Sequence, residues 1–197
     1  VPSRDSFGLF FEALTEAFGF VPCRDEGKLT GLAALGDPAR VREPELFRMD
    51  GESIVYTGPH GRQGVVWAKD TLLRKSPRED VAAWAQDILE KTVLDVARRW
   101  VDRTGLTRLA VAGGVFANVK LNQRLHELEG VDGLFVLPNM GDGGLSLGAV
   151  ALAGGGGCGR GDARTGLLPA PVLRRGGLSA AGMAWERQTH GGEERRP

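Results

Sequence analysis

The sequence has few cysteines, no excess of either charge and no long apolar run, and each absence excludes a class of protein. Its two cysteines, Cys23 and Cys158, lie far apart, so they form neither a disulfide framework nor the paired spacing of a zinc site. The 25 Lys and Arg residues balance 25 Asp and Glu residues, which removes a general electrostatic attraction to nucleic acid or an anionic membrane. No apolar stretch approaches the roughly 20 residues needed to span a bilayer. We therefore expect no membrane or nucleic-acid partner and a reducing, cytoplasmic location.

Glycine is unevenly distributed and divides the sequence into two parts. Many of the 30 glycines fall late, and a run of four at 154–157 opens a stretch rich in Gly, Arg, Ala and Pro. That stretch carries too little apolar surface to offset the entropy lost on ordering. We therefore expect one folded unit over residues 1–153 and a mostly disordered Gly/Arg-rich tail over 154–197, with a short ordered piece near Leu178–Trp185.

Apolar periodicity and turn residues predict alternating helices and strands. Five helices are expected, at Ser6–Phe18, Glu26–Leu35, Ser76–Gly105, Val115–Leu128 and Gly143–Leu152. Strands are expected at Leu46–Met49 and Ser53–Tyr56, joined as a hairpin, and at Arg108–Ala112 and Leu134–Leu137. The longest helix combines a capping Ser76, Pro77 at its first position and a capping-box Glu79 with a wide apolar stripe, which indicates a core helix lying on a sheet. The order strand, helix, strand, helix is typical of an α/β fold with right-handed crossovers.

The first candidate site is the turn in which the strand Arg108–Ala112 ends in Gly113 and Gly114. Glycine lets the backbone approach a ligand closely, and free N–H groups at the start of the following helix favour an anion. Asn118, one helical turn further on, is placed to donate a hydrogen bond to a phosphate or a ribose. The same residues are also compatible with a tight strand-to-helix turn that binds no ligand.

The second candidate is Asp142, which follows the strand Leu134–Leu137 and precedes a helix. A carboxylate there can ligate a divalent metal that bridges phosphate oxygens. It can also cap the helix through its side chain, and the two roles are compatible. Because the two strands are expected to be neighbours, we expect Asn118 and Asp142 to face the same ligand cavity.

The third candidate is the segment Glu26-Gly27-Lys28, at the entrance to a predicted helix. A carboxylate, a glycine and a lysine in that place can hold ribose hydroxyls or phosphates. The alternative is a solvated helix start in which the acidic residue interacts favourably with the helix dipole. On the local residues alone, this alternative is the better supported.

Taken together and in their order, these segments resemble the carbamoyltransferases related to those that modify nodulation factors and aminoglycoside or cephem antibiotics. The matching residues are Gly8 to Phe11, Thr15, Glu16, Gly19, Phe20, Asp25 to Lys28, Gly31 to Ala33, Gly113 to Val115, Asn118, Asn122, Pro138, Gly141, Asp142, Gly144 and Leu147 to Ala149. The resemblance covers residues 1–152 approximately. Each motif is modest, whereas the ordered set is fairly specific.

The resemblance implies a ribonuclease-H-like, actin-like ATPase half-domain with flanking helices and a small hairpin, similar to the nucleotide-binding domain of tRNA threonylcarbamoyl transferase. The residues it implies for ATP are Gly113, Gly114, Asn118, Glu26, Gly27 and Lys28. It implies that Asp142 completes a site for a divalent metal, Fe²⁺ or Mg²⁺. The implied reaction converts carbamoyl phosphate and ATP to a carbamoyl-adenylate, with release of pyrophosphate, and then transfers the carbamoyl group to an acceptor hydroxyl. It assigns no catalytic residue.

The sequence also departs from the family pattern. The family draws two metal-binding histidines at helical spacing from a stretch that is absent here, and His60, His126 and His190 do not lie within a helical turn of one another. One carboxylate cannot hold a catalytic metal by itself, and the region that binds carbamoyl phosphate is absent too. We therefore expect a fragment that is inactive alone. The alternatives are another actin-like ATPase, such as a sugar kinase or a threonylcarbamoyl transferase relative, and a small non-enzymatic domain.

Overall fold

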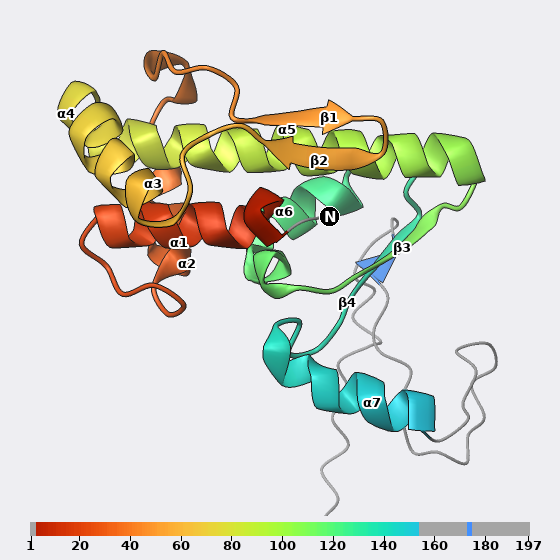
Figure 1. Ribbon diagram of the computed structural model, residues 1–197. Coiled ribbons are helices and arrows are strands. Elements are labelled where there is room, and N and C mark those ends of the chain that lie inside the picture. The colour runs from red at the N-terminus through yellow and green to blue at the C-terminus, as the bar shows by residue number, and fades with distance from the viewer. Residues whose placement is uncertain (1–2, 154–172, 175–197) are drawn as a thin grey trace, which may run out of the picture.

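A long helix, α5, runs through the structure, and the other elements are arranged around it (Figure 1). The computed structural model describes residues 3–153 and the two-residue strand at 173–174. The helices are α1 (Phe7–Ala17), α2 (Glu26–Ala33), α3 (Gly61–Trp67), α4 (Leu73–Lys75), α5 (Arg78–Thr104), α6 (Val119–His126) and α7 (Leu145–Ala153). The strands are β1 (Phe47–Asp50), β2 (Ser53–Tyr56), β3 (Arg108–Val111), β4 (Gly133–Val136) and β5 (Leu173–Arg174). The fold is mixed α/β, as the sequence predicts. The ordered piece expected near Leu178–Trp185 lies outside the described residues.

The two N-terminal helices, α1 and α2, are confirmed close to their predicted ends. Ser6 caps α1, because its hydroxyl oxygen accepts a hydrogen bond from the Gly8 N–H at 3.1 Å. Just beyond α1 the chain turns at Gly19, whose φ of 77° lies in the left-handed region. The helix α2 packs against α5 and buries its Leu29 completely. The helix α2 thus covers part of α5.

The start of α5 differs from the prediction, whereas its end is confirmed. Pro77 occupies the N-cap position without a side-chain cap bond, and the Ser76 N–H donates to the Leu72 carbonyl oxygen at 3.0 Å. The predicted capping box is therefore wrong, because Ser76 ends the preceding helical segment instead of opening α5. At the other end Gly105 stops the helix with a left-handed φ of 66°.

The first part of α5 is enclosed on all sides. Seven consecutive residues, from Asp80 to Gln86, are buried, which is the pattern of a helix in the centre of a core. Aromatic rings surround this part: Phe7 stacks on Phe47 with centroids 3.8 Å apart, and Trp84 meets Phe10 edge to face at 6.2 Å. The helix therefore packs against α2, α6 and the hairpin β1–β2 together, and does not simply lie on a sheet.

The strands form two small sheets. In the hairpin, β1 and β2 are antiparallel, with Phe47 opposite Tyr56. In the other sheet, β3 and β4 are parallel, with Val111 opposite Val136, and β5 pairs antiparallel with β4. The predicted hairpin and the predicted pair of neighbouring strands are both confirmed. Because β3 and β4 are parallel, the turns that follow them lie at the same edge of the sheet.

The connection from β3 to β4 contains a shorter helix than the sequence predicts. A 3-10 turn occupies Gly114–Ala117, the backbone is extended at Asn118, and α6 follows from Val119 to His126. The predicted single helix from Val115 is therefore wrong in its first turn. The physical reason is that Asn118 leaves the helical conformation and caps α6 with its side chain.

A helical segment between the hairpin and α5 is absent from the sequence prediction. It consists of α3, a π-helical stretch at Ala68–Leu72 and α4. Its buried residues Val65, Ala68 and Leu72 recur every three or four positions, which is helical spacing. Two glycines in its first turn, Gly61 and Gly64, lower the intrinsic helix propensity and obscure this pattern.

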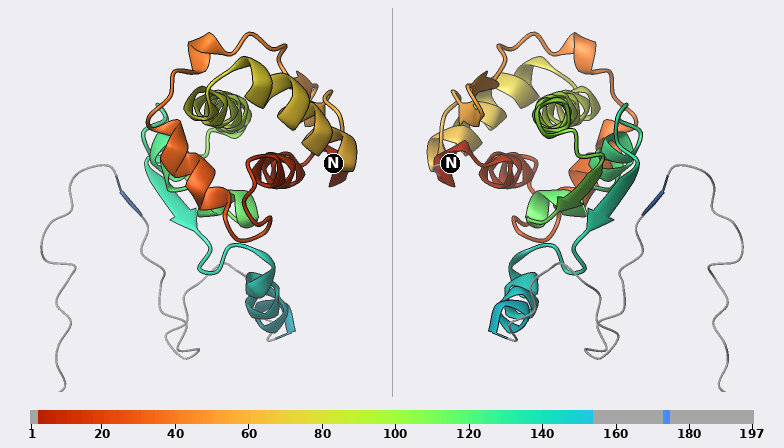
Figure 2. Two further views of the ribbon diagram at one scale, coloured as in Figure 1. Left: turned by 90° about the vertical axis from the view of Figure 1, so that its left-hand side faces the viewer. Right: turned by 90° about the vertical axis from the view of Figure 1, so that its right-hand side faces the viewer.

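The last helix, α7, lies apart from the helices around α5. Figure 2 views α1 and α5 end-on, roughly parallel to each other, with α7 separated from both. Its side chains Leu145 and Val150 are 72% and 67% exposed. The predicted helix Gly143–Leu152 is thus confirmed as α7, preceded by a 3-10 turn at Asp142–Gly144. Although α7 is apolar, the described part of the chain contains no helix long and apolar enough to cross a membrane.

The loop that follows α2 is fixed to the start of α5. The buried carboxylate of Asp80 accepts a hydrogen bond from the Asp37 N–H at 2.8 Å and lies 3.7 Å from the Arg40 guanidinium. Beside it, Gly36 is so close to α5 that a Cβ built there would meet the Glu79 carbonyl oxygen at 2.0 Å. Because the obstructing atom belongs to the backbone, a larger residue would have to displace the loop or the helix.

We expect Gly36→Ala to lower the free energy of unfolding by about 1–3 kcal/mol, the usual cost of forcing atoms into a packed interior. Gly31→Ala is the matched control, because a Cβ on Gly31 in α2 would meet nothing within 4 Å and alanine is favoured over glycine in helices by roughly 0.5–1 kcal/mol. Urea unfolding followed by far-UV circular dichroism measures both. Equal stability of the two variants would contradict the close contact.

Candidate functional site

The two glycine-containing turns lie side by side at the ends of β3 and β4. The Gly113 N–H donates to the Met140 carbonyl oxygen at 2.7 Å, and a Cβ built on Gly141 would lie 4.0 Å from the Gly114 Cα. The backbone conformation at Gly113, with a φ of 112°, is one that glycine adopts without strain. The parallel strands therefore bring two of the three predicted segments into contact.

The turn after β3, which we call the glycine turn (Gly113–Ala117), offers backbone donors. The Gly113 N–H is used by Met140, but the N–H groups of Gly114 and Val115 have no hydrogen-bond partner within the described part of the chain. A Cβ on Gly113 or Gly114 would meet nothing within 4 Å, so the space beside them is open. Adjacent N–H groups beside open space can bind an anion such as a phosphate.

The side chain of Asn118 uses all of its hydrogen-bonding positions within the protein. Its Oδ1 accepts bonds from the Leu121 N–H at 3.0 Å and from Gln86 Nε2 at 3.2 Å. Its Nδ2 donates to Gln86 Oε1 at 2.7 Å and to Thr30 Oγ1 at 3.3 Å. Two donated and two accepted bonds complete the capacity of an amide. Asn118 thus joins α2, α5 and α6, and its predicted contact with a phosphate or a ribose stays a prediction that requires one of these bonds to be exchanged.

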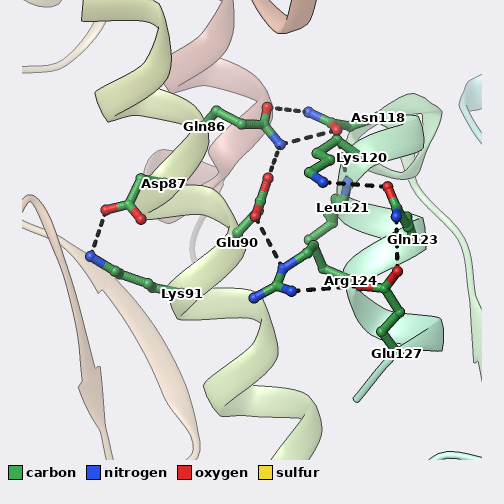
Figure 3. Close-up of polar contacts among 10 residues, drawn as sticks. All are labelled: Gln86, Asp87, Glu90, Lys91, Asn118, Lys120, Leu121, Gln123, Arg124 and Glu127. Carbon is green, nitrogen blue, oxygen red and sulfur yellow. Dashed lines mark hydrogen bonds and ion pairs between the residues drawn. The ribbon is translucent and has the colours of Figure 1, made fainter. Parts of the chain in front are cut away.

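The contacts of Asn118 continue along α5 and α6 (Figure 3). Gln86 donates a hydrogen bond to Glu90 Oε1 at 2.8 Å, and Glu90 Oε2 lies 3.5 Å from Arg124 Nε. The sequence reasoning missed Gln86. The signal for it was weak: Gln86 and Asp87 interrupt the apolar run from Val81 to Leu89, and a polar side chain that becomes buried must have a partner.

The entrance to α2, which contains the third predicted segment, is held in place by Asp25. The Asp25 carboxylate accepts a hydrogen bond from the Val21 N–H at 3.1 Å and pairs with Arg24 at 3.2 Å and Lys28 at 3.0 Å. The hydrogen bonds from Arg24 and Lys28 hold the pKa of Asp25 well below its usual range. The ammonium of Lys28 is therefore kept at the helix entrance while its side chain stays half exposed.

Three carboxylates affect the pKa of Cys23, which lies in the loop before α2. The Cys23 thiol donates to Glu12 Oε1 at 2.6 Å, and the Cys23 N–H donates to Glu26 Oε1 at 2.6 Å. The hydrogen bond to Glu12, together with the negative charges of Glu12, Glu26 and Asp142, raises the pKa of Cys23 above the usual value for a thiol. Asp142 is therefore near enough to this loop to act on it electrostatically. The start of α2 and the predicted metal ligand lie in one region.

The described residues do not by themselves form a complete metal site. Among them, no three His, Cys, Asp or Glu side chains are grouped so as to hold a metal ion. Asp142 is exposed, Gly141 and not Asp142 occupies the cap of the following 3-10 turn, and no described residue donates a hydrogen bond to the Asp142 carboxylate. Since divalent cations take about six ligands, a cation at Asp142 needs ligands from outside this part of the chain.

A cavity of about 380 Å³ lies next to this region, between α1, the end of β2 and the start of α3. Its walls include Tyr56, Glu12 and Glu16, and the rim includes Arg62, which pairs with Glu16 at 3.6 Å. None of the predicted site residues lines it, but Glu12 belongs both to the cavity and to the surroundings of Cys23. The volume is enough for a small ligand, and the cavity is a neighbour of the predicted nucleotide segments.

The chain is similar to several known proteins. Residues 63–151 match the family described as carbamoyltransferase N-terminus. An uncharacterized protein of Methanocaldococcus jannaschii is 32% identical over 157 residues, which cover 75% of this chain and 25% of that protein. Nodulation protein NolO of Bradyrhizobium diazoefficiens is 34% identical over 160 residues, covering 77% and 29%. Nodulation protein NolNO of Sinorhizobium fredii is 32% identical over 158 residues, covering 77% and 23%. The chain therefore spans less than a third of the length of these relatives.

Because neighbouring carboxylates raise the pKa of Cys23, we expect its thiol to react with iodoacetamide at about pH 8 more slowly than the thiol of an unstructured peptide. Glu12→Gln and Asp142→Asn each remove a negative charge, so each should lower the pKa of Cys23 and speed its alkylation, Glu12→Gln more strongly. Mass spectrometry of the Cys23 peptide over a pH series gives the rates. Asp132→Asn, at the opposite, exposed end of β4, is the control, and an unchanged rate in Asp142→Asn would place Asp142 away from Cys23.

Proposed function

The chain belongs to the carbamoyltransferase family, and we propose that it forms the nucleotide-binding part of an ATP-dependent O-carbamoyltransferase. The observation that carries this proposal is the junction of Gly113 with Met140, where the turns after two parallel strands meet beside open space. Ligands of parallel α/β sheets bind at the carboxyl ends of the strands. The proposed substrates are ATP, carbamoyl phosphate and an acceptor that carries a hydroxyl group.

In the proposed complex the phosphates of ATP lie at the glycine turn. The free N–H groups of Gly114 and Val115 support this placement, because they can donate to phosphate oxygens. Glu26, Gly27 and Lys28 lie near the nucleotide, and the Lys28 ammonium contributes a positive charge there. Gly113 and Asn118 complete the proposed set of nucleotide residues, and the bonds of Asn118 to the protein hold the turn in place.

The charge of the region supports a divalent cation, Mg²⁺ or Fe²⁺, as part of the proposal. Glu12, Glu26 and Asp142 all act on Cys23, so a triphosphate bound nearby would be repelled by carboxylates. A cation that lies between phosphate and carboxylate oxygens removes this repulsion and stabilises charge on the phosphates. Asp142 is the proposed ligand from this chain, with the remaining ligands supplied by other parts of the whole enzyme.

The proposed reaction forms a carbamoyl-adenylate from carbamoyl phosphate, ATP and water, with release of phosphate and pyrophosphate, and then transfers the carbamoyl group to the acceptor hydroxyl, with release of AMP. The residues of this chain bind and orient the nucleotide. Fixed orientation of the reacting groups lowers the barrier, because the entropy of bringing them together is lost on binding and not in the reaction itself.

We further propose that residues 1–153 are half of a ribonuclease-H-like, actin-like ATPase domain, that 154–197 form a tail, and that the protein is cytoplasmic. The strands β3 and β4 form one parallel pair, and parallel sheets are ordinarily covered by helices on both faces. A pair this small supports a half-domain, because the rest of such a sheet and its covering would come from further chain. The exposed apolar side chains of α7 add a surface that further chain can cover. The isolated chain should therefore bind nucleotide but transfer no carbamoyl group.

We expect calorimetric titration of the chain with ATP and Mg²⁺, or with ATP and Fe²⁺, to show binding with a dissociation constant of about 1 mM. Asp142→Asn should weaken the cation-dependent binding about tenfold, because it removes the proposed metal ligand of this chain. The control Asp132→Asn should leave the affinity unchanged. Absence of heat at millimolar nucleotide, or equal affinity with and without the cation, would contradict the proposal.

A further inference from the structure

The side-chain amides of Gln86 and Asn118 face each other and exchange two hydrogen bonds (Figure 3). Asn118 Nδ2 donates to Gln86 Oε1 at 2.7 Å, and Gln86 Nε2 donates to Asn118 Oδ1 at 3.2 Å. Turning either amide over would set donor against donor and acceptor against acceptor. Each of the two residues therefore fixes the orientation of the other.

A second hydrogen bond from its amide nitrogen also holds Gln86 in place. It is 6% exposed, and its Nε2 also donates to Glu90 Oε1 at 2.8 Å. Glu90 in turn lies 3.5 Å from Arg124 of α6, as the dashed lines of Figure 3 show. Because a buried amide that rotates out of these bonds leaves polar groups unpaired, the arrangement resists rotation.

Asn118 connects two of the segments proposed to bind nucleotide. It follows the glycine turn directly and caps α6, and its Nδ2 also donates to Thr30 Oγ1 of α2 at 3.3 Å. Thr30 lies four residues after Glu26 in α2, so the two side chains project from the same face of the helix. The orientation of Asn118 therefore sets how the glycine turn lies relative to the entrance of α2.

We propose that Gln86 is a positioning residue of the nucleotide site, which acts through Asn118 to hold the glycine turn against α2 and does not touch the ligand. This inference rests on the proposed function, since the ligand it serves is the nucleotide. It assigns a role to a residue 32 positions before Asn118, on a helix that contributes no proposed ligand contact.

The test compares variants of the full chain by NMR and by calorimetry with ATP and Mg²⁺. Gln86→Met keeps the length of the side chain and removes its hydrogen bonds. Thr92→Val is the matched control, because Thr92 is also buried in α5 and has no hydrogen bond to Asn118. Gln86→Glu is the conservative variant, since a protonated carboxyl group can donate to Asn118 as the amide does, whereas a carboxylate cannot.

We expect the backbone amide resonances of Gly113 and Gly114 to shift in Gln86→Met and not in Thr92→Val. In Gln86→Glu they should return toward the unaltered chain as the pH falls and the new carboxyl group is protonated. Nucleotide affinity should fall about tenfold in Gln86→Met, the order expected for one or two lost hydrogen bonds. Gln86→Met combined with Asn118→Ala should bind no more weakly than Asn118→Ala alone, because Gln86 acts through Asn118.

The two proposals fail in different ways. If the unaltered chain binds no nucleotide, the proposed function is wrong, and the resonances of Gly113 and Gly114 still decide the role of Gln86. If those resonances are the same in Gln86→Met as in the unaltered chain, or if nucleotide binds equally well to both, the positioning role is overturned. Should Gln86→Met prevent folding, the pH dependence of Gln86→Glu gives the decision in its place, and resonances that do not change with protonation overturn the inference.

Discussion

The enclosure of the first part of α5 is the constraint on which the rest of the structure depends. A helix buried on every side must pair the polar groups that it carries into the core, and Asp80 and Gln86 are two such groups in the first part of α5. Asp80 binds the loop that leaves α2, and Gln86 binds Asn118 next to the glycine turn. The same burial that stabilises the core therefore fixes two loops, and the second of them belongs to the proposed nucleotide site.

Much of the fold could be predicted because its local signals agree with its packing. The helix α1, the hairpin β1–β2 and the strands β3 and β4 are all set by short-range patterns. Apart from the missed helical segment before α5, the errors arose where a residue had two possible roles. Ser76 had the sequence of a cap but ends the helix before it, and Asn118 could continue a helix but starts a new one. Which role wins depends on contacts with distant residues.

For the candidate site, only the arrangement of the backbone could be predicted from the sequence. The adjacency of the glycine turn and Gly141 follows from the parallel order of the strands, and that order is readable from the sequence. The side-chain contacts are not readable in this way, because Gln86 meets Asn118, 32 positions away, only after α5 and α6 have packed, and Glu12 meets Cys23 only through the fold of the loop between α1 and α2. Their carboxylate and amide groups looked like ordinary surface residues until the helices that carry them were placed.

The way in which α7 is attached to the rest of the chain determines how the region after β4 can move. Within the described part of the chain the main contact of α7 is with the 3-10 turn at Asp142–Gly144, and that turn follows the segment whose Met140 carbonyl is bonded to Gly113. If the 3-10 turn acts as a hinge, α7 moves about it as a rigid arm. With nine residues it is about 13 Å long, so a rotation of roughly 10° at the hinge displaces its far end by about 2 Å. A rotation of that turn, which follows the residue bonded to Gly113, would therefore move the exposed apolar side chains of α7 further than the turn itself.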